Sequence, residues 1–322
     1  MSARFVIGKV LASLATLAFV VVFNFFLFRV VESDPVSTLF RGRNLTAQQR
    51  DTLTRQFGLD GSKGEQFVRY LGQTAHLNFG RSYVTNQSVW TEIKDKAPPT
   101  IVLVGVSTLL STIFGILIGV AAAWKRGSPT DYASTTFTMA TYSMPDFWLG
   151  MLLLSALAVA LGWFPVGGIT DPGSDATGLA KLADQAQHMF LPALTLTLAY
   201  LGEYALVMRS SLLDTMREDY LVLARAKGLR DVMVRNRHAV PNALLPVVTL
   251  IAINFGLVLS GAIAVETIFS WPGLGLATYD ALNGPDLPML QGLFLVFSAA
   301  VIACNFVADL LYAYLDPRVR TA

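Results

Sequence analysis

The chain has 322 residues, of which 53% are hydrophobic and only 14% are charged, and its mean hydropathy is +0.52. Because soluble globular chains carry about 25% charged residues, this composition excludes an ordinary soluble domain and predicts an integral membrane protein. The net charge of +2 is too small to indicate a nucleic-acid partner, and a single cysteine, Cys304, excludes an intrachain disulfide.

The N-terminal segment, 1–31, contains an apolar run over 10–28 that follows Arg4 and Lys9. At 1.5 Å per residue the run is about 28 Å long, close to the hydrocarbon thickness of a bilayer. It is too long for the apolar part of a signal peptide, and no small-residue cleavage site follows it. We therefore expect an uncleaved first transmembrane helix.

The next segment, 32–97, is predicted to be folded and extracytoplasmic. Thr46 and Gln49 have the spacing of a capping box, and Gly58 is placed to end the helix that they begin. A second helix is expected over 65–76.

Five more segments have the length and apolar composition of transmembrane helices. Only helices satisfy the backbone hydrogen bonds of such segments in lipid, because none shows the alternation of a barrel strand. They lie at about 99–123, 133–161, 189–208, 244–267 and 291–315. Pro98 and Pro99 mark the start of the first of these, in which Gly115 and Gly119 form a G-x-x-x-G pair that lets another helix approach closely.

The placement of lysine and arginine predicts the orientation of these six spans. Basic residues gather near the N-terminus, after the second span, in the segment 209–243 and in the tail 317–322, whereas the two short outer loops hold only Lys181. Both termini are therefore predicted to be cytoplasmic. The outer loop 162–188 is rich in proline and glycine, which predict turns.

The cytoplasmic segment 209–243 is predicted to contain a short helix. Asp219 can cap a helix that begins at Tyr220, and Gly228 can end it in the left-handed conformation. A second, basic helix follows before Pro241. Such a segment is either a docking element for a partner or an ordinary basic loop that binds anionic lipid.

The same segment resembles the EAA loop of ABC-importer permeases, in which Glu-Ala-Ala is followed after three residues by Gly and after nine more by Ile-x-Leu-Pro. Gly228 and Pro241 keep that spacing, and Ala224 matches the second alanine. The glutamate, the first alanine and the isoleucine are replaced, by Val222, Leu223 and His238. The form ARAKGL…RHAVPNALLP resembles the variant found in dipeptide and oligopeptide permeases of the B type.

Six further segments resemble that family, in the same order along the chain. They are ESDPV (32–36), NFGRSY (78–83), MPDFWLG (144–150), LGWFPVGG (161–168), AVETIFSWPGLG (264–275) and DLLYAYLDPRVR (309–320). The chain is therefore identified as a member of the dipeptide/oligopeptide family of ABC-importer permeases.

This resemblance implies the all-α, six-helix fold of a type I ABC-importer permease in the cell membrane, with the permease domain at 98–316. It implies three kinds of partner: a second homologous permease, two ATPase subunits or one fused ATPase, and an extracytoplasmic peptide-binding protein. The implied coupling residues are Asp219, Tyr220, Ala224, Arg225, Ala226, Lys227, Gly228 and Pro241.

The chain contains no G-x-x-x-x-G-K-[ST] phosphate loop, so ATP and magnesium are expected to bind only to the partner subunits. We assign the chain itself no cofactor and no catalytic residue. The resemblance implies peptide cargo, although similar permeases also carry glutathione and nickel chelates.

Polar residues inside the predicted spans are candidates for function, because exposing them to lipid is costly. Glu203 either pairs with a cation such as Arg209 or faces a cavity, and Asn254 either bonds to a neighbouring helix or lines the pathway. Glu266 and Trp271 are candidates for an outer gate.

The three histidines, His76, His188 and His238, are expected in loops and share no metal-ligand spacing, so we assign no metal. Two other interpretations remain open. A transporter driven by an ion gradient predicts inverted repeats, and a membrane anchor predicts that the outer segment binds a partner.

Overall fold

The structure is a computed structural model that describes residues 3–31, 46–56, 59–284 and 286–315. The segment 32–36, Gly58 and the tail 317–322 lie outside the described residues. In chain order the helices are α1 (Ala3–Phe25), α3 (Ala47–Gln56), α4 (Lys63–Ala75), α5 (Val89–Trp124), α6 (Pro129–Ser143), α7 (Asp146–Leu153), α8 (Gly178–Thr215), α9 (Asp219–Ala226), α10 (Asp231–Met233), α11 (Val240–Ala243), α12 (Leu245–Ile268), α13 (Leu274–Asn283) and α14 (Leu287–Leu315). The π-helical turns η1 (Phe26–Val31), η2 (Leu154–Ala160) and η3 (Val234–Ala239) continue α1, α7 and α10.

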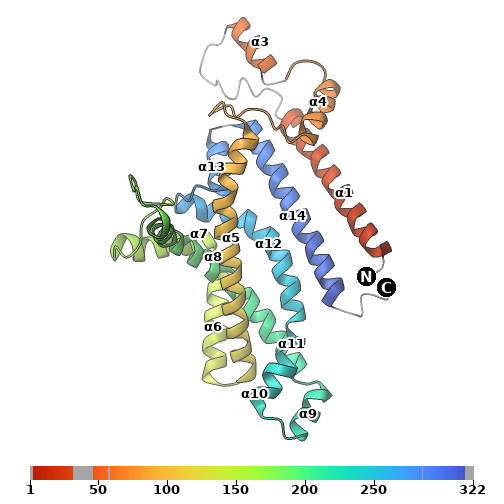
Figure 1. The fold of residues 1–322 in the computed structure, drawn as a ribbon, viewed down its shortest axis with the longest axis vertical. Helices are drawn as coiled ribbons and strands as arrows, with labels where there is room; N and C mark the ends of the chain where they lie inside the picture. The colour runs from red at the N-terminus through yellow and green to blue at the C-terminus, as the bar shows by residue number, and fades with distance from the viewer. Residues whose placement is uncertain (1–2, 32–45, 57–58, 285, 316–322) are drawn as a thin grey trace.

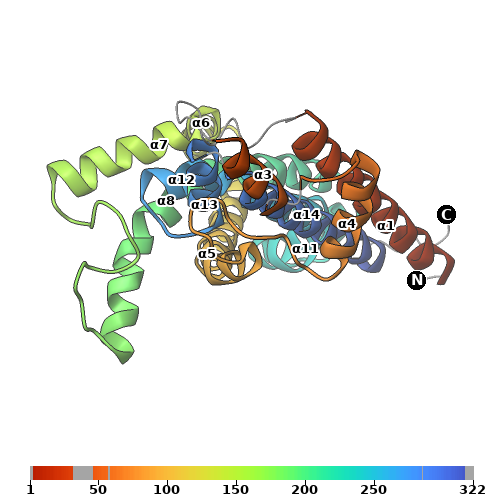
Figure 2. The same cartoon turned by 90° about the horizontal axis from the view of Figure 1, so that it is seen from above.

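The helices form an elongated bundle (Figure 1). Helices α3 and α4 lie at one end, and α9 and α10 lie at the opposite end. Figure 2 shows α7 and the first part of α8 extending sideways from the bundle. We call α7, η2, the loop 161–177 and the first turns of α8 the arm.

Four helices of the described residues are long and apolar enough to cross a membrane: α1 with η1, α5, α8 and α14. A bent pair, α6 with α7 and η2, passes the same test as a fifth. The predicted span 244–267 coincides with α12, which has 24 residues. The described part is therefore mostly helical, as predicted, while the count of six spans and their orientation stay predictions.

The predicted span 133–161 is not one continuous helix, and that expectation was wrong. Its two halves meet at an angle of 103°. Met144 adopts the β conformation, with φ −84° and ψ 132°, because a proline disfavours the α conformation in the residue before it. Pro145 then lies at the N-cap of α7.

Helix α5 begins ten residues earlier than predicted, at Val89, so that Pro98 and Pro99 lie inside it. A proline in a helix interior costs about 3 kcal/mol. Val89 and Ile93 are 0% and 2% exposed and pack against α13 and α14. Burial of this first part of α5 therefore outweighs the local signal of the prolines.

Helix α8 has 38 residues, about 57 Å, which exceeds the roughly 30 Å of a hydrocarbon core. It begins at Gly178, so the predicted turns of the loop 162–188 extend only to residue 177.

The G-x-x-x-G pair of α5 packs against α8, as predicted. A Cβ at Gly115 would lie 2.6 Å from the Tyr204 Cβ, and one at Gly119 would lie 2.5 Å from the carbonyl oxygen of Ala205. Only glycine permits this approach of the two backbones.

The two helices predicted between the first and second spans are confirmed. The Thr46 amide donates to Gln49 Oε1 at 2.9 Å, and the Gln49 amide donates to Thr46 Oγ1 at 3.3 Å. Helix α4 begins with a second capping box, formed by Ser62 and Glu65.

Candidate functional site

The short cytoplasmic helix predicted from the sequence is α9. It begins at Asp219, with Glu218 at the N-cap in an extended conformation and no side-chain cap bond. The prediction that Asp219 caps a helix starting at Tyr220 was therefore wrong by one residue. The Asp219 carboxylate lies in the first turn, where it complements the partial positive charge of the helix N-terminus.

Gly228 ends α9 as predicted, with φ +76°. Its amide donates to the carbonyl of Arg225 at 2.9 Å, and the Leu229 amide donates to the carbonyl of Ala224 at 3.4 Å. This pair of bonds is a Schellman motif, which places the residue after the C-cap in the left-handed region that favours glycine. The position therefore explains why glycine is needed there.

Helix α9 has one face buried against its own chain and one face exposed. Leu221 and Ala224 are 0% and 7% exposed and belong to a cluster with residues of α5, α8, η3, α11 and α12. On the other side, Val222 is 59% exposed and Leu223 is 56% exposed. A helix that is packed on one side and exposes apolar side chains on the other is suited to dock onto a partner.

Contacts of Arg225 and Tyr220 hold the two ends of α9, and Trp124 also contacts α10. The Arg225 guanidinium lies 5.7 Å from the centroid of the Trp124 ring, at the end of α5, and Trp124 Nε1 donates to Asp231 Oδ2 at 2.9 Å. At the start of α9, Asn242 Nδ2 donates to the Tyr220 hydroxyl at 3.1 Å. Helix α9 is thereby tied to α5 and to α11.

The remaining predicted coupling residues have less contact with the chain. Ala226 and Lys227 are exposed at the C-terminal end of α9. Pro241 lies at the start of α11, which follows η3 without a break, and it has no amide hydrogen to donate to a carbonyl of η3.

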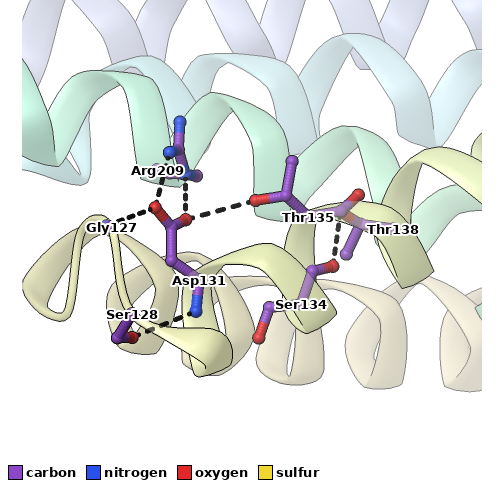
Figure 3. A network of polar contacts seen from close by, with 7 residues as sticks. All are labelled: Gly127, Ser128, Asp131, Ser134, Thr135, Thr138 and Arg209. Carbon is purple, nitrogen blue, oxygen red and sulfur yellow. Dashed lines mark hydrogen bonds and ion pairs between the residues drawn. The ribbon is translucent and has the colours of Figure 1, made fainter.

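An ion pair that the sequence did not reveal joins α6 to α8 (Figure 3). Arg209 Nε donates to Asp131 Oδ1 at 2.8 Å, and its Nη2 donates to Oδ2 at 3.0 Å. The Gly127 amide donates to the same carboxylate at 3.0 Å, and Asp131 is 4% exposed. The expected pairing of Arg209 with Glu203 was therefore wrong. The local sequence indicates only the helix start: Ser128, three residues before Asp131, is the N-cap of α6.

The two polar residues predicted within the fourth and fifth spans meet. Asn254 Nδ2 donates to Glu203 Oε2 at 2.7 Å, which joins α12 to α8. Asn254 is 3% exposed, and Glu203 is half-buried. Their role in a pathway stays a prediction, but the contact places a hydrogen bond between polar side chains at this helix junction.

Glu266 holds the N-terminus of α13. Its carboxylate is fully buried and accepts hydrogen bonds from Thr100 Oγ1 at 2.6 Å and from the amides of Gly275 and Leu276 at 2.7 and 3.1 Å. The first amides of a helix lack partners within the helix and favour an anion. Glu266 therefore connects α5, α12 and α13.

Trp271 reinforces that junction, because its Nε1 donates to the carbonyl of Pro99 at 3.1 Å. Both gate candidates thus lie at one junction of helices. Whether they gate a pathway stays a prediction.

The expectation that all three histidines lie in loops was wrong. His188 lies on α8 and is buried, His238 lies in η3, and His76 is the C-cap of α4. Asp171 and Asp184 lie beside His188. Sequence spacing alone did not indicate this cluster.

Two family descriptions match nearly the whole chain. Residues 115–321 match the description "binding-protein-dependent transport system inner membrane component", and residues 2–104 match the N-terminal part of such a membrane component.

Three relatives match over almost their full length. The chain is 38% identical over 315 residues to a di/tripeptide transport system permease protein, DppB, of Pseudomonas aeruginosa, with 94% of each chain covered. It is 37% identical over 317 residues to a glutathione transport system permease protein, GsiC, of Salmonella paratyphi A, covering 98% of this chain and 99% of the relative. A putative peptide permease of Brucella ovis is 34% identical over 319 residues, with the same coverage.

Two solved structures share the fold. An inward-facing MetNI methionine ABC transporter superposes with a TM-score of 0.56 at 16% identity, covering 70% of this chain and 96% of that chain. An amino acid ABC transporter with histidines gives 0.50 at 12% identity, covering 71% and 94%. At these identities the likeness shows the fold alone.

Proposed function

This chain belongs to the family of binding-protein-dependent transport system inner membrane components, and from that membership we propose that it forms half of the pathway by which an ATP-driven importer moves di- and oligopeptides inward. Members of this family are multi-pass permeases of the cell membrane and work with ATPase subunits and a solute-binding protein. The observation that carries the proposal is that helix α9 has one face buried against its own chain and one apolar face exposed.

We propose that the exposed face of α9 docks onto an ATPase subunit. The apolar side chains of Val222 and Leu223 are exposed, at the end of the bundle that we propose to be cytoplasmic, where they suit a groove on a partner. The opposite face is fixed by the buried cluster around Leu221. A displacement of α9 is therefore passed to the helices behind it. In this proposal ATP and magnesium bind to the ATPase partners, either two subunits or one fused chain.

The arm is the proposed contact with a second, homologous permease subunit. It carries large apolar side chains that the rest of the chain leaves exposed: Val159 (69%), Trp163 (62%), Val166 (61%), Leu179 (85%) and Leu182 (60%). A group of exposed apolar side chains of this kind marks a contact with protein or lipid. The shape of the arm, which extends away from the bundle (Figure 2), favours a second subunit.

Peptide cargo is proposed because the di/tripeptide and glutathione permeases are similar to this chain to nearly the same degree, 38% and 37% identity. Both kinds of cargo contain peptide bonds and carboxylates. Glutathione or a nickel chelate is the alternative within the same importer role. The Glu203–Asn254 pair is the proposed polar lining, and Glu266 with Trp271 the proposed outer gate.

The docking proposal is tested with Leu223→Asp in the reconstituted complex of permeases, ATPases and binding protein. A charge buried in an apolar interface is costly, so we expect peptide-stimulated ATP hydrolysis and peptide uptake to fall at least about tenfold, or about 1.4 kcal/mol. Val232→Asp is the matched control, because Val232 is 57% exposed on neighbouring α10. We expect this control to keep wild-type uptake.

Two results contradict the proposal. Wild-type assembly and uptake by Leu223→Asp would exclude docking through this face. Uptake driven by a proton gradient without any ATPase would instead favour a secondary transporter.

Gly228→Pro, which cannot adopt the φ of +76°, is expected to leave ATP hydrolysis but uncouple it from uptake.

A further inference from the structure

His188 is buried on α8 between two carboxylates of the arm. Its side chain is 2% exposed, its Nε2 lies 3.7 Å from Asp171 Oδ1, and its Nδ1 lies 3.0 Å from Asp184 Oδ1. One ligand atom of each of the three residues lies within 4.8 Å of the other two. Asp184 and His188 are one helical turn apart, whereas Asp171 comes from the loop 161–177. The cluster therefore joins the loop of the arm to its helix.

The hydrogen bonds around His188 fix which ring nitrogen has a lone pair. Nδ1 lies 3.0 Å from the backbone carbonyl oxygen of Asp184. A carbonyl oxygen only accepts hydrogen bonds, so Nδ1 carries the hydrogen and the neutral ring has its lone pair on Nε2. Nε2 then faces the Asp171 carboxylate, which is also an acceptor. A metal cation between these two acceptors binds both of them, and a second proton on the ring is the alternative.

We infer that His188, Asp171 and Asp184 form a binding site for a divalent transition-metal ion, for which Zn²⁺ is the best-matched probe. One imidazole nitrogen and two carboxylate oxygens, with water as the fourth ligand, make a common zinc coordination set. Tetrahedral bonds of about 2.0–2.2 Å place ligand atoms about 3.3–3.6 Å apart. The separation of 3.7 Å between His188 Nε2 and Asp171 Oδ1 needs little change to reach this range. The Asp184 carboxylate, whose Oδ1 lies 3.0 Å from Nδ1, must turn towards Nε2 to complete the site.

The surroundings of the ring support this assignment. A metal-binding histidine usually donates its second ring N–H to a carbonyl or carboxylate, which is the contact that His188 Nδ1 makes. The Asp171 amide donates to both Asp184 oxygens, at 3.3 and 3.2 Å, and so holds the loop against the helix. The Asp171 side chain is 73% exposed, which gives an ion access from the surface.

The bound ion fixes the shape of the arm, because it links residues on both sides of the turn that leads into α8. This consequence rests on the proposed function only where the arm is taken to contact a second permease. The metal site itself does not depend on transport.

The test is a titration of the purified full chain, carrying a tag without histidine, with Zn²⁺ against a competing chelator. We expect one Zn²⁺ per chain, at least tenfold weaker binding by Asp171→Asn, and loss of this binding in His188→Ala. Asp171→Asn is the decisive variant, because an exposed side chain can be changed without threatening the fold. The visible spectrum of bound Co²⁺ gives an independent report on tetrahedral coordination.

His76→Ala is the matched control. His76 Nδ1 also faces a carbonyl oxygen four residues earlier, that of Gly72 at 2.8 Å, but His76 lies outside the cluster. We expect its zinc affinity to equal that of the wild type. Equal affinities of the wild type and Asp171→Asn would overturn the inference, as would a folded wild-type chain that binds no stoichiometric zinc. In the second case a proton on His188 takes the place of the ion. Since neither readout uses transport, failure here leaves the proposed function untouched.

Discussion

The substitution Asp131→Asn removes the charge of the carboxylate that joins α6 to α8 and keeps its size. Asp131 is 4% exposed and the Arg209 side chain is 27% exposed. The carboxylate receives two hydrogen bonds from Arg209, one from the Gly127 amide and one from Thr135 Oγ1 (Figure 3). Each oxygen accepts two of these bonds, one of them from Arg209. Asparagine replaces one oxygen with a donor, so Arg209 loses its ionic partner and the two bonds accepted by that oxygen are lost.

The structure sets the size of this effect. Removing one partner of a buried ion pair costs about 3–5 kcal/mol, mostly because the other charge stays buried. About a quarter of the Arg209 side chain is exposed, so water relieves part of that cost. We therefore expect the free energy of unfolding to fall by about 2–3 kcal/mol.

The assay is reversible unfolding in mixed detergent and SDS, followed by circular dichroism. Asp51→Asn is the matched control, because Asp51 forms an exposed pair with Arg55 at 2.8 Å. Exposed pairs contribute less than about 1 kcal/mol. The single variant Arg209→Gln and the double variant complete a double-mutant cycle with Asp131→Asn, in which we expect a coupling energy of at least about 1 kcal/mol.

A loss of less than about 0.5 kcal/mol for Asp131→Asn would refute the reasoning, as would additive effects in the cycle. Either result would mean that desolvation of the two charges cancels their attraction.

Three further substitutions test the helix junctions by the same unfolding assay. Gly119→Ala is expected to lower the free energy of unfolding by about 1–3 kcal/mol, because the new Cβ would lie 2.5 Å from the Ala205 carbonyl oxygen of α8. Gly105 has open space around it, so Gly105→Ala is expected to raise the free energy of unfolding by about 0.5–1 kcal/mol. Thr100→Val removes the hydrogen-bond donor to the buried Glu266 carboxylate and the acceptor for the Leu274 amide, and is expected to cost about 1–3 kcal/mol. Its control, Thr278→Val, loses only a bond to a carbonyl of its own helix and is expected to cost less than about 1 kcal/mol. Asn254→Leu removes the donor to the glutamate of α8 and is expected to cost about 1.5–3 kcal/mol, and a cost near zero would show that this bond does not hold the junction.

The positions of the long helices could be predicted because length and apolar composition are local properties of the sequence. The same holds for α9, where Gly228 marks the end and the Schellman bonds explain why. Pro145 was a local signal for the bend in the predicted span 133–161. The length of the apolar stretch nevertheless led to the prediction of one continuous helix.

The partners of the polar residues could not be predicted in the same way, because they depend on which helices meet. One error was avoidable: Glu203 and Arg209 are six residues apart, and only residues three or four apart on a helix face each other. Arg209 instead pairs with Asp131, 78 residues earlier in the chain. Likewise, Asp171 reaches His188 only because the loop 161–177 folds back on α8.

The buried cluster behind α9 determines which helices must respond to a force on that helix. Leu221 belongs to one buried cluster with Ala123 of α5, Met208 and Leu212 of α8, and Val247 of α12. A packed interior transmits displacement with little compression, so the ends of these helices next to α9 are expected to move with it. Helix α6 is expected to follow α8 through the Asp131 ion pair.

Further from α9, the contact between α8 and α12 contains the hydrogen bond of Asn254 to Glu203 at 2.7 Å. A change of access that separates α8 from α12 must break this bond, whereas one that moves both helices as a unit must keep it. Spin labels placed on these two helices in the complex, with and without ATP, distinguish the two. Separation in the ATP-bound state would show that the Glu203–Asn254 pair is a moving contact, and a constant distance would show that α8 and α12 move as a rigid unit.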